Sequence, residues 1–288
     1  MSWTTIDKDA CTLCGTCVTR CPCFRKKGEE ILTRADEATC NLCGHCIALC
    51  PEDAITHQLL DMKNFPSLEP RPAWGPEEFL RFVRQRRSHR HFEDKAIPRK
   101  ALETLVELSR YSPTGSNWQT TGLLLIEDRG RIKRLSDHTV DFFEQRIPEI
   151  ERDIAERREK GVAIPEELRP MYGMVEVLKR VVKARQFGLE VMFHSAPAVL
   201  MFYAPASAST PKDDCVIAST TVTLGAMTLG LETCYIGLFE FAANTYPPIV
   251  EDLKLPPDDK VYSVLVAGYP KLKFRRTVDR KPMRVRWE

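Results

Sequence analysis

The sequence feature that most constrains this chain is a repeated run of cysteines near its N-terminus. Nine of the 11 cysteines lie between Cys11 and Cys50. Eight of the nine form two copies of the pattern Cys-x2-Cys-x2-Cys-x3-Cys-Pro, and the copies begin at Cys11 and Cys40. The first residues lack the charged start and apolar core of a signal peptide. We therefore expect a cytoplasmic protein in which these cysteines form a metal site rather than a disulfide framework.

Three cysteines at successive three-residue steps wrap the chain around one compact cluster, and a fourth, followed by proline, points away. This is the run of bacterial two-cluster ferredoxins, in which the fourth cysteine ligates the other cluster. Residues 1–62 resemble that ferredoxin domain, which implies two 4Fe–4S clusters with exchanged fourth ligands. The first set of ligands is then Cys11, Cys14, Cys17 and Cys50, and the second set is Cys40, Cys43, Cys46 and Cys21.

Structural zinc is the alternative interpretation of these cysteines. Zinc sites usually pair two Cys-x2–4-Cys knuckles and need neither the third cysteine nor the Cys-Pro step. The spacing therefore favours iron–sulfur clusters. Cys23 lies outside the register of the repeat, and we interpret it as a small buried apolar residue rather than an alternate ligand.

A proline-rich linker at 63–75 separates the cysteine-rich domain from a larger domain at 76–288. The larger domain alternates helical and strand patterns, which predicts a layered α/β or α+β fold. The four predicted strands are Gly122–Glu127, Pro197–Ala204, Cys234–Leu238 and Val261–Ala267. Pro76 opens a predicted helix whose phenylalanines, Phe79 and Phe82, we expect in the core.

A long charged stretch, about 130–191, is helical in pattern. Prolines at 148 and 165 predict breaks in this helix. Its length is typical of a lid or of an insertion that embraces a partner subunit.

Four further segments carry the chemistry of the larger domain. Neither a Gly-x-Gly-x-x-Gly fingerprint nor a P-loop is present, so a Rossmann site has no support. Instead, a basic turn at 86–92 precedes the loop 112–119, the segment 229–237 and the segment 264–270, which basic residues follow. Guanidinium groups suit an anionic phosphate because they bind its oxygens in pairs. In this order and spacing, residues 77–288 resemble the FMN-dependent nitroreductase family.

The resemblance implies where FMN binds. It assigns the FMN phosphate and ribityl chain to Arg86, Arg87, Ser88 and Arg90. It assigns contacts with the flavin of a partner subunit to Pro113, Thr114, Ser116, Asn117 and Gln119. It places backbone N–H groups near the flavin N5 at Tyr235, Ile236 and Gly237. A basic pair closes on the phosphate, for which Arg280 and Lys281 match best and Arg275 and Arg276 are runners-up.

The resemblance also implies an α+β fold, with a mixed sheet flanked by helices, and an intertwined homodimer with FMN at its interface. One departure concerns the pocket, because the proline that usually follows the loop glutamine is Thr120 here. We expect that change to alter which class of substrate binds more than it alters the choice of cofactor.

The combined interpretation is an oxidoreductase that passes electrons from a low-potential donor, such as reduced ferredoxin, through two clusters to FMN. The flavin then reduces a planar, electron-poor acceptor such as a nitroaromatic or a quinone, and no protein side chain need act as a catalytic acid or nucleophile. A redox carrier or sensor that serves a protein partner is the alternative, as are reductive dehalogenation and flavin-consuming chemistry. A net charge of +2 gives no support for a nucleic-acid or membrane partner.

Overall fold

The computed structural model describes residues 2–288, which form two compact units. The first unit runs to Ala73 and includes Ser116–Trp118, and the second comprises Trp74–Gly115 and Gln119–Glu288. The division at 73 and 74 falls within the predicted linker. Within residues 2–288, no helix is both long enough and apolar enough to cross a membrane.

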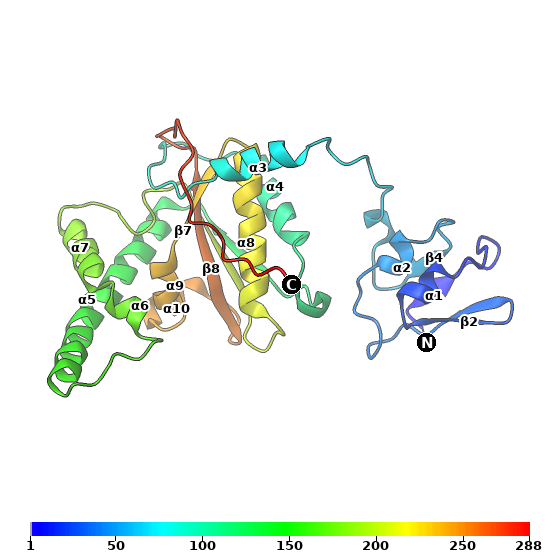
Figure 1. Ribbon diagram of the computed structural model, residues 1–288, viewed down its shortest axis with the longest axis horizontal. Helices are drawn as coiled ribbons and strands as arrows, with labels where there is room; N and C mark the ends of the chain where they lie inside the picture. The colour runs from blue at the N-terminus through cyan, green and yellow to red at the C-terminus, as the bar shows by residue number, and fades with distance from the viewer. Residues whose placement is uncertain (1) are drawn as a thin grey trace. The chain divides into compact units, whose positions relative to one another are not determined.

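The first unit contains two short antiparallel strand pairs and two short helices (Figure 1). Strand β1 (Thr4–Ile6) pairs with β4 (Ile55–His57), and β2 (Phe24–Lys27) pairs with β3 (Glu30–Thr33). The helices are α1 (Thr16–Arg20) and α2 (His45–Ala48), and a 3-10 turn, η1, covers Met62–Asn64.

The backbone of the first unit repeats along with its sequence. Leu13 and Leu42 both adopt left-handed conformations, with φ of 55° and 56°. Gly15 and Gly44, which precede the two helices, have φ of 77° and 69°. Glycine reaches this region without steric cost. The glycine after the second cysteine of each copy therefore turns the chain into a helix that carries the third cysteine.

The second unit is larger and combines helices with one sheet. Its strands are β5 (Gly122–Ile126), β6 (Ala198–Pro205), β7 (Glu232–Tyr235) and β8 (Asp259–Gly268). Its helices are α3 (Pro76–Gln85), α4 (Arg99–Arg110), α5 (Arg129–Glu159), α6 (Arg169–Tyr172), α7 (Val175–Gln186), α8 (Pro211–Thr228), α9 (Gly237–Ala243) and α10 (Pro247–Leu253). The 3-10 turn η2 covers Gly115–Asn117, of which only Gly115 belongs to the second unit.

The sheet order is β5-β6-β8-β7, and every pair of neighbouring strands is antiparallel. Alternate residues of β6 belong to two different cores, because successive side chains of a strand point to opposite faces. Val199 and Met201 belong to one core, whereas Leu200 and Phe202 belong to the other. Figure 1 shows α5, α7, α9 and α10 on one face and α4 and α8 on the other. This burial on both faces explains the continuous apolar run of β6.

The sequence predicts an α+β fold with a mixed sheet, and the structure has an α+β fold. The sheet itself is antiparallel and not mixed, because its strands β5, β6, β8 and β7 all pair antiparallel. Ser88 forms an isolated parallel bridge with Thr233 of β7, so the chain after α3 lies beside the edge of the sheet without forming a full strand.

Two local predictions are wrong. The long helix does not break at Pro148, because α5 continues through this proline and ends only at Glu159. The strand predicted at Cys234–Leu238 ends at Tyr235, and Gly237 begins α9 instead. Apolar runs this short do not distinguish a strand end from a buried helix start.

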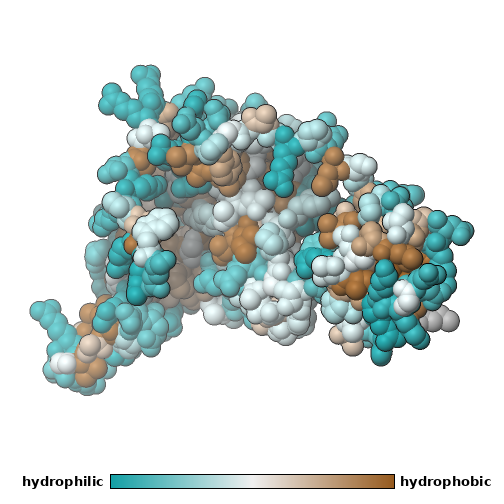
Figure 2. Space-filling view, turned by 45° about the vertical axis from the view of Figure 1, so that its right-hand side comes forward, coloured by the Kyte–Doolittle hydropathy of each residue, from teal (hydrophilic) through white to brown (hydrophobic). Residues whose placement is uncertain are grey.

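The expectation that the phenylalanines of α3 lie in the core is also wrong. No residue of α3 is buried, and Phe79 and Leu80 are about half exposed, at 51% and 47%. Figure 2 shows further hydrophobic residues at the surface of the protein, and in the first unit Leu59 is among those exposed. Trp74 packs against Phe79 and Phe82, but the described chain covers the apolar face of α3 only in part.

Gly268, at the end of β8, packs so closely against its neighbours that a larger side chain is not expected to fit. A Cβ at this position would lie 2.6 Å from the Cδ of Pro197 and 2.9 Å from Cδ1 of Phe92. The proline ring is rigid and Phe92 is buried, so neither yields easily. Gly268→Ala should destabilise the second unit by about 1–3 kcal/mol, the usual cost of overpacking.

Denaturant unfolding followed by circular dichroism measures this change. Gly237→Ala is the matched control, because a Cβ there meets no atom within 4 Å. Equal stability of the two variants would contradict the packing described at Gly268.

Candidate cofactor sites

Two cavities in the first unit are each lined by four of the repeated cysteines. One is lined by Cys11, Cys14, Cys17 and Cys50. The other is lined by Cys21, Cys40, Cys43 and Cys46. The fourth cysteine of each copy thus lies in the cavity of the other copy. Among residues 2–288, no three His, Cys, Asp or Glu side chains converge closely enough to hold a single metal ion.

Cys23 lies in the second cavity beside these four cysteines. It is buried, with 4% of its surface exposed, and its thiol donates to the carbonyl oxygen of Thr39 at 3.4 Å. Its burial and its neutral partner agree with the interpretation of Cys23 as a small packing residue.

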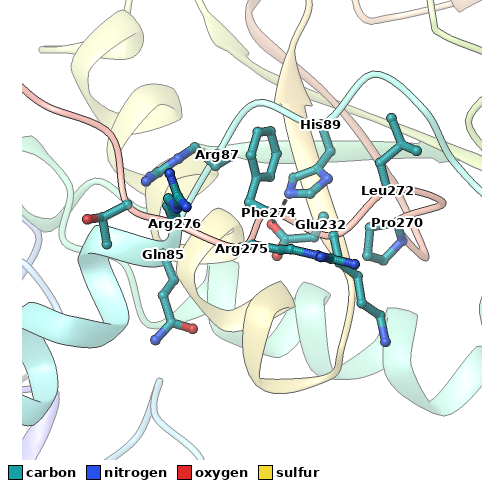
Figure 3. A pocket seen from close by; sticks show the side chains of 11 residues that line it. Gln85, Arg87, His89, Glu232, Pro270, Leu272, Phe274, Arg275 and Arg276 are labelled. Carbon is teal, nitrogen blue, oxygen red and sulfur yellow. Dashed lines mark ion pairs between the residues drawn. The ribbon is translucent and has the colours of Figure 1, made fainter.

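A third cavity, of about 440 Å³, lies in the second unit between the chain after α3 and the chain after β8 (Figure 3). Backbone hydrogen bonds hold these two segments together. The Lys271 N–H donates to the His91 carbonyl, and the Glu93 N–H donates to the Tyr269 carbonyl, both at 2.9 Å. Cationic side chains on both segments line the cavity, namely Arg87, Lys273, Arg275 and Arg276.

Arg87 is the buried cation of this cavity, with 8% of its surface exposed. Its Nη1 donates to the carbonyl oxygens of Arg84 (2.7 Å) and Arg86 (2.6 Å) and so caps the C-terminal end of α3. Its Nε is buried and has no hydrogen-bond partner in the described chain. A bound oxyanion would supply the missing acceptor, since guanidinium groups bind oxyanions through paired N–H donors.

Glu232 and His89 add two titratable groups to the same cavity. The His89 Nε2 lies 3.5 Å from a Glu232 carboxylate oxygen, and the His89 ring packs edge-on against Phe274. Burial raises the pKa of Glu232 to about 7, although Arg86 and Arg87 act in the opposite direction. Burial and the nearby Arg87 lower the pKa of His89. The net charge of the cavity therefore changes near neutral pH, when Glu232 ionises.

The structure divides the predicted phosphate residues between two environments. Arg87 lines the cavity, whereas Ser88 and Arg90 are not among the lining residues. Ser88 and Arg90 instead act on the thiol of Cys234, a buried residue of β7. They lower the pKa of this thiol, whereas its burial raises the pKa by more. Alternation along an extended chain explains the division, because successive side chains point to opposite sides.

The predicted basic pair near the C-terminus also lies outside the Arg87 cavity. Arg280 lines a neighbouring cavity together with Arg81 and Arg84 of α3, and Lys281 is exposed. The runners-up, Arg275 and Arg276, line the Arg87 cavity itself.

The predicted loop 112–119 is held in a compact conformation. Ser116, Asn117 and Gln119 adopt positive φ values of 51°, 59° and 53°. The Gln119 N–H donates to Thr114 Oγ1 at 3.0 Å. The Gly115 N–H donates to a carboxylate oxygen of Asp214, at 2.9 Å, which ties the loop to the start of α8.

The predicted backbone donors after β7 are only partly available. The Ile236 N–H already donates to the Val264 carbonyl at 2.9 Å. Gly237 begins α9, and N–H groups in the first turn of a helix have no partner within the helix. The Tyr235 hydroxyl lies 3.1 Å from Ser219 Oγ and 3.0 Å from Thr220 Oγ1 on α8. Gly237 is therefore the better candidate donor.

Sequence reasoning missed Glu232, Phe274 and Asp214 as parts of these sites. A single carboxylate or phenylalanine carries no motif, and its role depends on contacts between distant segments. Glu232 does lie within the segment 229–237, but nothing in the sequence of that segment indicates that its carboxyl is partly buried.

Comparison with known proteins identifies the family of the second unit. Residues 83–269 match the model of the nitroreductase family. A protein of Archaeoglobus fulgidus, provisionally named NADH dehydrogenase/NAD(P)H nitroreductase, is 22% identical, and the match covers 68% of this chain and 87% of that protein.

Solved structures show the same fold. A nitroreductase with bound FMN from Bacteroides fragilis has a TM-score of 0.55 at 19% identity, covering 73% of this chain and 99% of that one. A nitroreductase with bound FMN from Desulfitobacterium hafniense has a TM-score of 0.52 at 15% identity, covering 72% and 97%. The second unit thus has the fold of flavin-binding oxidoreductases, and the chain belongs to the nitroreductase family.

The raised pKa of Glu232 predicts that anion binding in the Arg87 cavity depends on pH. Below pH 7 the carboxyl is protonated and the cavity is cationic, whereas above pH 7 a carboxylate opposes a bound anion. If binding raises the pKa of Glu232 by about one unit, sulfate affinity should fall by roughly fivefold between pH 6 and pH 8.

Calorimetric titration with sulfate measures this effect, because sulfate keeps its charge over that range. Glu232→Gln should bind sulfate with nearly constant affinity. A wild-type affinity that stays constant or rises with pH would contradict the assignment.

Proposed function

We propose that this chain is an FMN-dependent oxidoreductase in which two 4Fe–4S clusters deliver electrons to the flavin. One observation carries the proposal: each set of four cysteines expected from an exchanged ferredoxin pattern lines a cavity of its own. The rest of the chain belongs to a family of oxidoreductases. Because one polypeptide carries both a unit for one-electron carriers and a flavin domain, we expect electrons to pass from the clusters to the flavin.

The cysteine cavities fit clusters in both number and kind of ligand. A 4Fe–4S cluster takes four thiolates. It also occupies a volume, so its ligands surround a cavity instead of converging on one point. When bound, the clusters supply one-electron transfer, and FMN supplies the conversion of single electrons into a two-electron reduction.

The Arg87 cavity suits the phosphate end of FMN. The buried Arg87 offers an unpaired Nε–H, and Arg275 and Arg276 add charge from the opposite segment. These two residues are better placed for closing on the phosphate than Arg280 and Lys281, which do not line this cavity. Arg86, with Ser88 and Arg90 on the other side of the same segment, is assigned to the remainder of the phosphate and the ribityl chain.

The proposed assembly is a homodimer. Phe79 and Leu80 leave an apolar face of α3 exposed. The segment after β8 is also exposed and carries large apolar side chains, with Trp287 92% exposed. Burial of both surfaces by a second copy would remove exposed apolar area from water. The loop residues Pro113, Thr114, Ser116, Asn117 and Gln119 would then approach the flavin of the partner subunit.

The proposed donor is reduced ferredoxin or another low-potential one-electron carrier, and the proposed acceptor is a nitroaromatic or a quinone. Such an acceptor is planar and electron-poor, so it can stack on a reduced flavin. The residues of this chain bind and orient the two partners and exclude water, and none is assigned a role as catalytic acid or base.

Metal content tests the cysteine assignment. Anaerobically reconstituted protein should contain about eight iron atoms per chain, four in each of two clusters. Cys14→Ser should lower this value, because it removes one ligand of the first set. Cys14 is exposed, so the substitution does not disturb the core. Cys23→Ser should leave it unchanged.

Iron analysis and visible absorption provide the measurement. Binding of about two zinc ions per chain, with no cluster absorption, is the pattern of structural zinc sites and would overturn the proposal.

The electron source provides a second test. Reduced ferredoxin should bleach the flavin much faster than NADH or NADPH does. In a Cys14→Ser, Cys43→Ser double variant this fast phase should disappear while FMN stays bound, because both cysteines are exposed and lie in the first unit.

Anaerobic stopped-flow absorbance measures the bleaching. If NADPH bleaches the flavin rapidly, and equally fast in the double variant, then electrons do not reach the flavin through the clusters.

A further inference from the structure

The two cysteine cavities have different electrostatic surroundings. Apart from its cysteines, the first is lined mainly by aliphatic and threonine side chains and by the carboxylate of Glu52, and none of its lining residues is Lys, Arg or His. The second is lined by Arg20, His45 and His57, and none of its lining residues is Asp or Glu. An added electron is therefore better stabilised in the second cavity than in the first.

His57 makes a specific contact with one cysteine of the second set. Its Nε2 lies 3.6 Å from the Sγ of Cys40. Its Nδ1 accepts the N–H of Leu59 at 3.1 Å. An acceptor Nδ1 leaves the ring proton on Nε2, because the partner of one ring nitrogen determines the state of the other. Nε2–H therefore donates to the Cys40 sulfur.

The imidazole is held in this orientation by its surroundings. Only 6% of His57 is exposed, and the Trp3 ring packs against it edge-on, with the ring centres 6.2 Å apart. His57 ends β4, where it pairs with Thr4 of β1. The donor is thus placed by the sheet of the first unit and does not depend on a mobile side chain.

The first copy of the repeat lacks this donor. The copies are offset by the distance from Cys11 to Cys40, so the position that corresponds to His57 is Gly28, which has no side chain. The donors near the first set include the Ala54 N–H, 3.3 Å from Cys50 Sγ, and the Thr16 hydroxyl, 3.4 Å from Cys14 Sγ. Thr12 and the backbone N–H groups of Thr16 and Val18 also hydrogen-bond to this set, but no imidazole of the described chain does.

We propose that the cluster held by the second set has the higher reduction potential, and that the His57 N–H···S bond to Cys40 is a main cause. This inference rests on the proposed function, since it requires both clusters. Hydrogen bonds to the sulfurs, net charge and solvent exposure set the potential of an iron–sulfur cluster. The guanidinium of Arg20, which donates to His45 Nδ1 at 3.0 Å, acts in the same direction as His57. The first electron taken up by the pair therefore resides mainly in the second set.

A redox titration of the holoprotein, followed by electron paramagnetic resonance, tests this inference. Wild-type protein should show two one-electron cluster steps. His57→Phe keeps a ring beside Trp3 but removes the donor, so the upper step should fall by about 59 mV, a tenfold change in electron occupancy. His57→Gln retains an N–H donor and should restore most of the shift.

Two exposed positions provide matched controls. Arg20→Gln should lower the same upper step by less than His57→Phe does, because exposed charges are screened. Thr16→Val, beside the first set, should change the lower step or neither step. These two variants also decide the order of the clusters if His57→Phe does not assemble.

The outcomes separate this inference from the proposed function. An upper step that is unchanged in His57→Phe at full iron content would overturn the role of His57 alone. A lower step that responds to Arg20→Gln, or an upper step that responds to Thr16→Val, would reverse the assigned order of the clusters. Absence of clusters from wild-type protein would overturn the proposed function, and this inference with it.

Discussion

The exchange of the fourth cysteine between two copies of a short repeat is the constraint on which the first unit depends. Cys21 leaves its own copy and lines the cavity of Cys40, Cys43 and Cys46, while Cys50 lines the other cavity. Each cavity is therefore complete only when both copies are folded. In a unit this small, with a core of few apolar residues, ligands that cross between the halves would supply stability that packing alone does not.

The second unit depends on a sheet that is buried on both faces. Because β6 and β8 lie at its centre, their side chains fill two separate cores and fix the helices on each side. The edge of the sheet beyond β7 is where the chain after α3 and the chain after β8 come together. The cationic cavity lies at this edge, so its charged residues do not compete with the apolar cores for burial.

The sequence predicted much of this organisation. The two cysteine sets followed from the resemblance of the repeat to the ferredoxin run, and each set lines one cavity. The order of strands and helices followed from apolar runs and prolines, except at Pro148 and at Ile236–Leu238. Those two failures have a common cause, since tertiary packing decides whether a proline is tolerated and where a short apolar run changes structure.

The site in the second unit was less predictable. Arg87 was recognised in its motif, but the side chains that complete its cavity come from the segment after β8, where Arg275 and Arg276 ranked behind Arg280 and Lys281. The pKa of Glu232, raised to about 7, comes from burial that no local pattern reveals. Likewise, His57 becomes a hydrogen-bond donor to Cys40 only through the pairing of β1 with β4.

The central claim is that the two clusters and the flavin of one chain exchange electrons with one another. An anaerobic titration of the holoprotein with dithionite tests this most directly, because it counts electrons. Two one-electron clusters and a two-electron flavin should take up about four electrons per chain. A nitroaromatic or a quinone should then restore the absorption of both clusters and flavin. Uptake of only two electrons, or reoxidation of the flavin while the clusters stay reduced, would contradict the account.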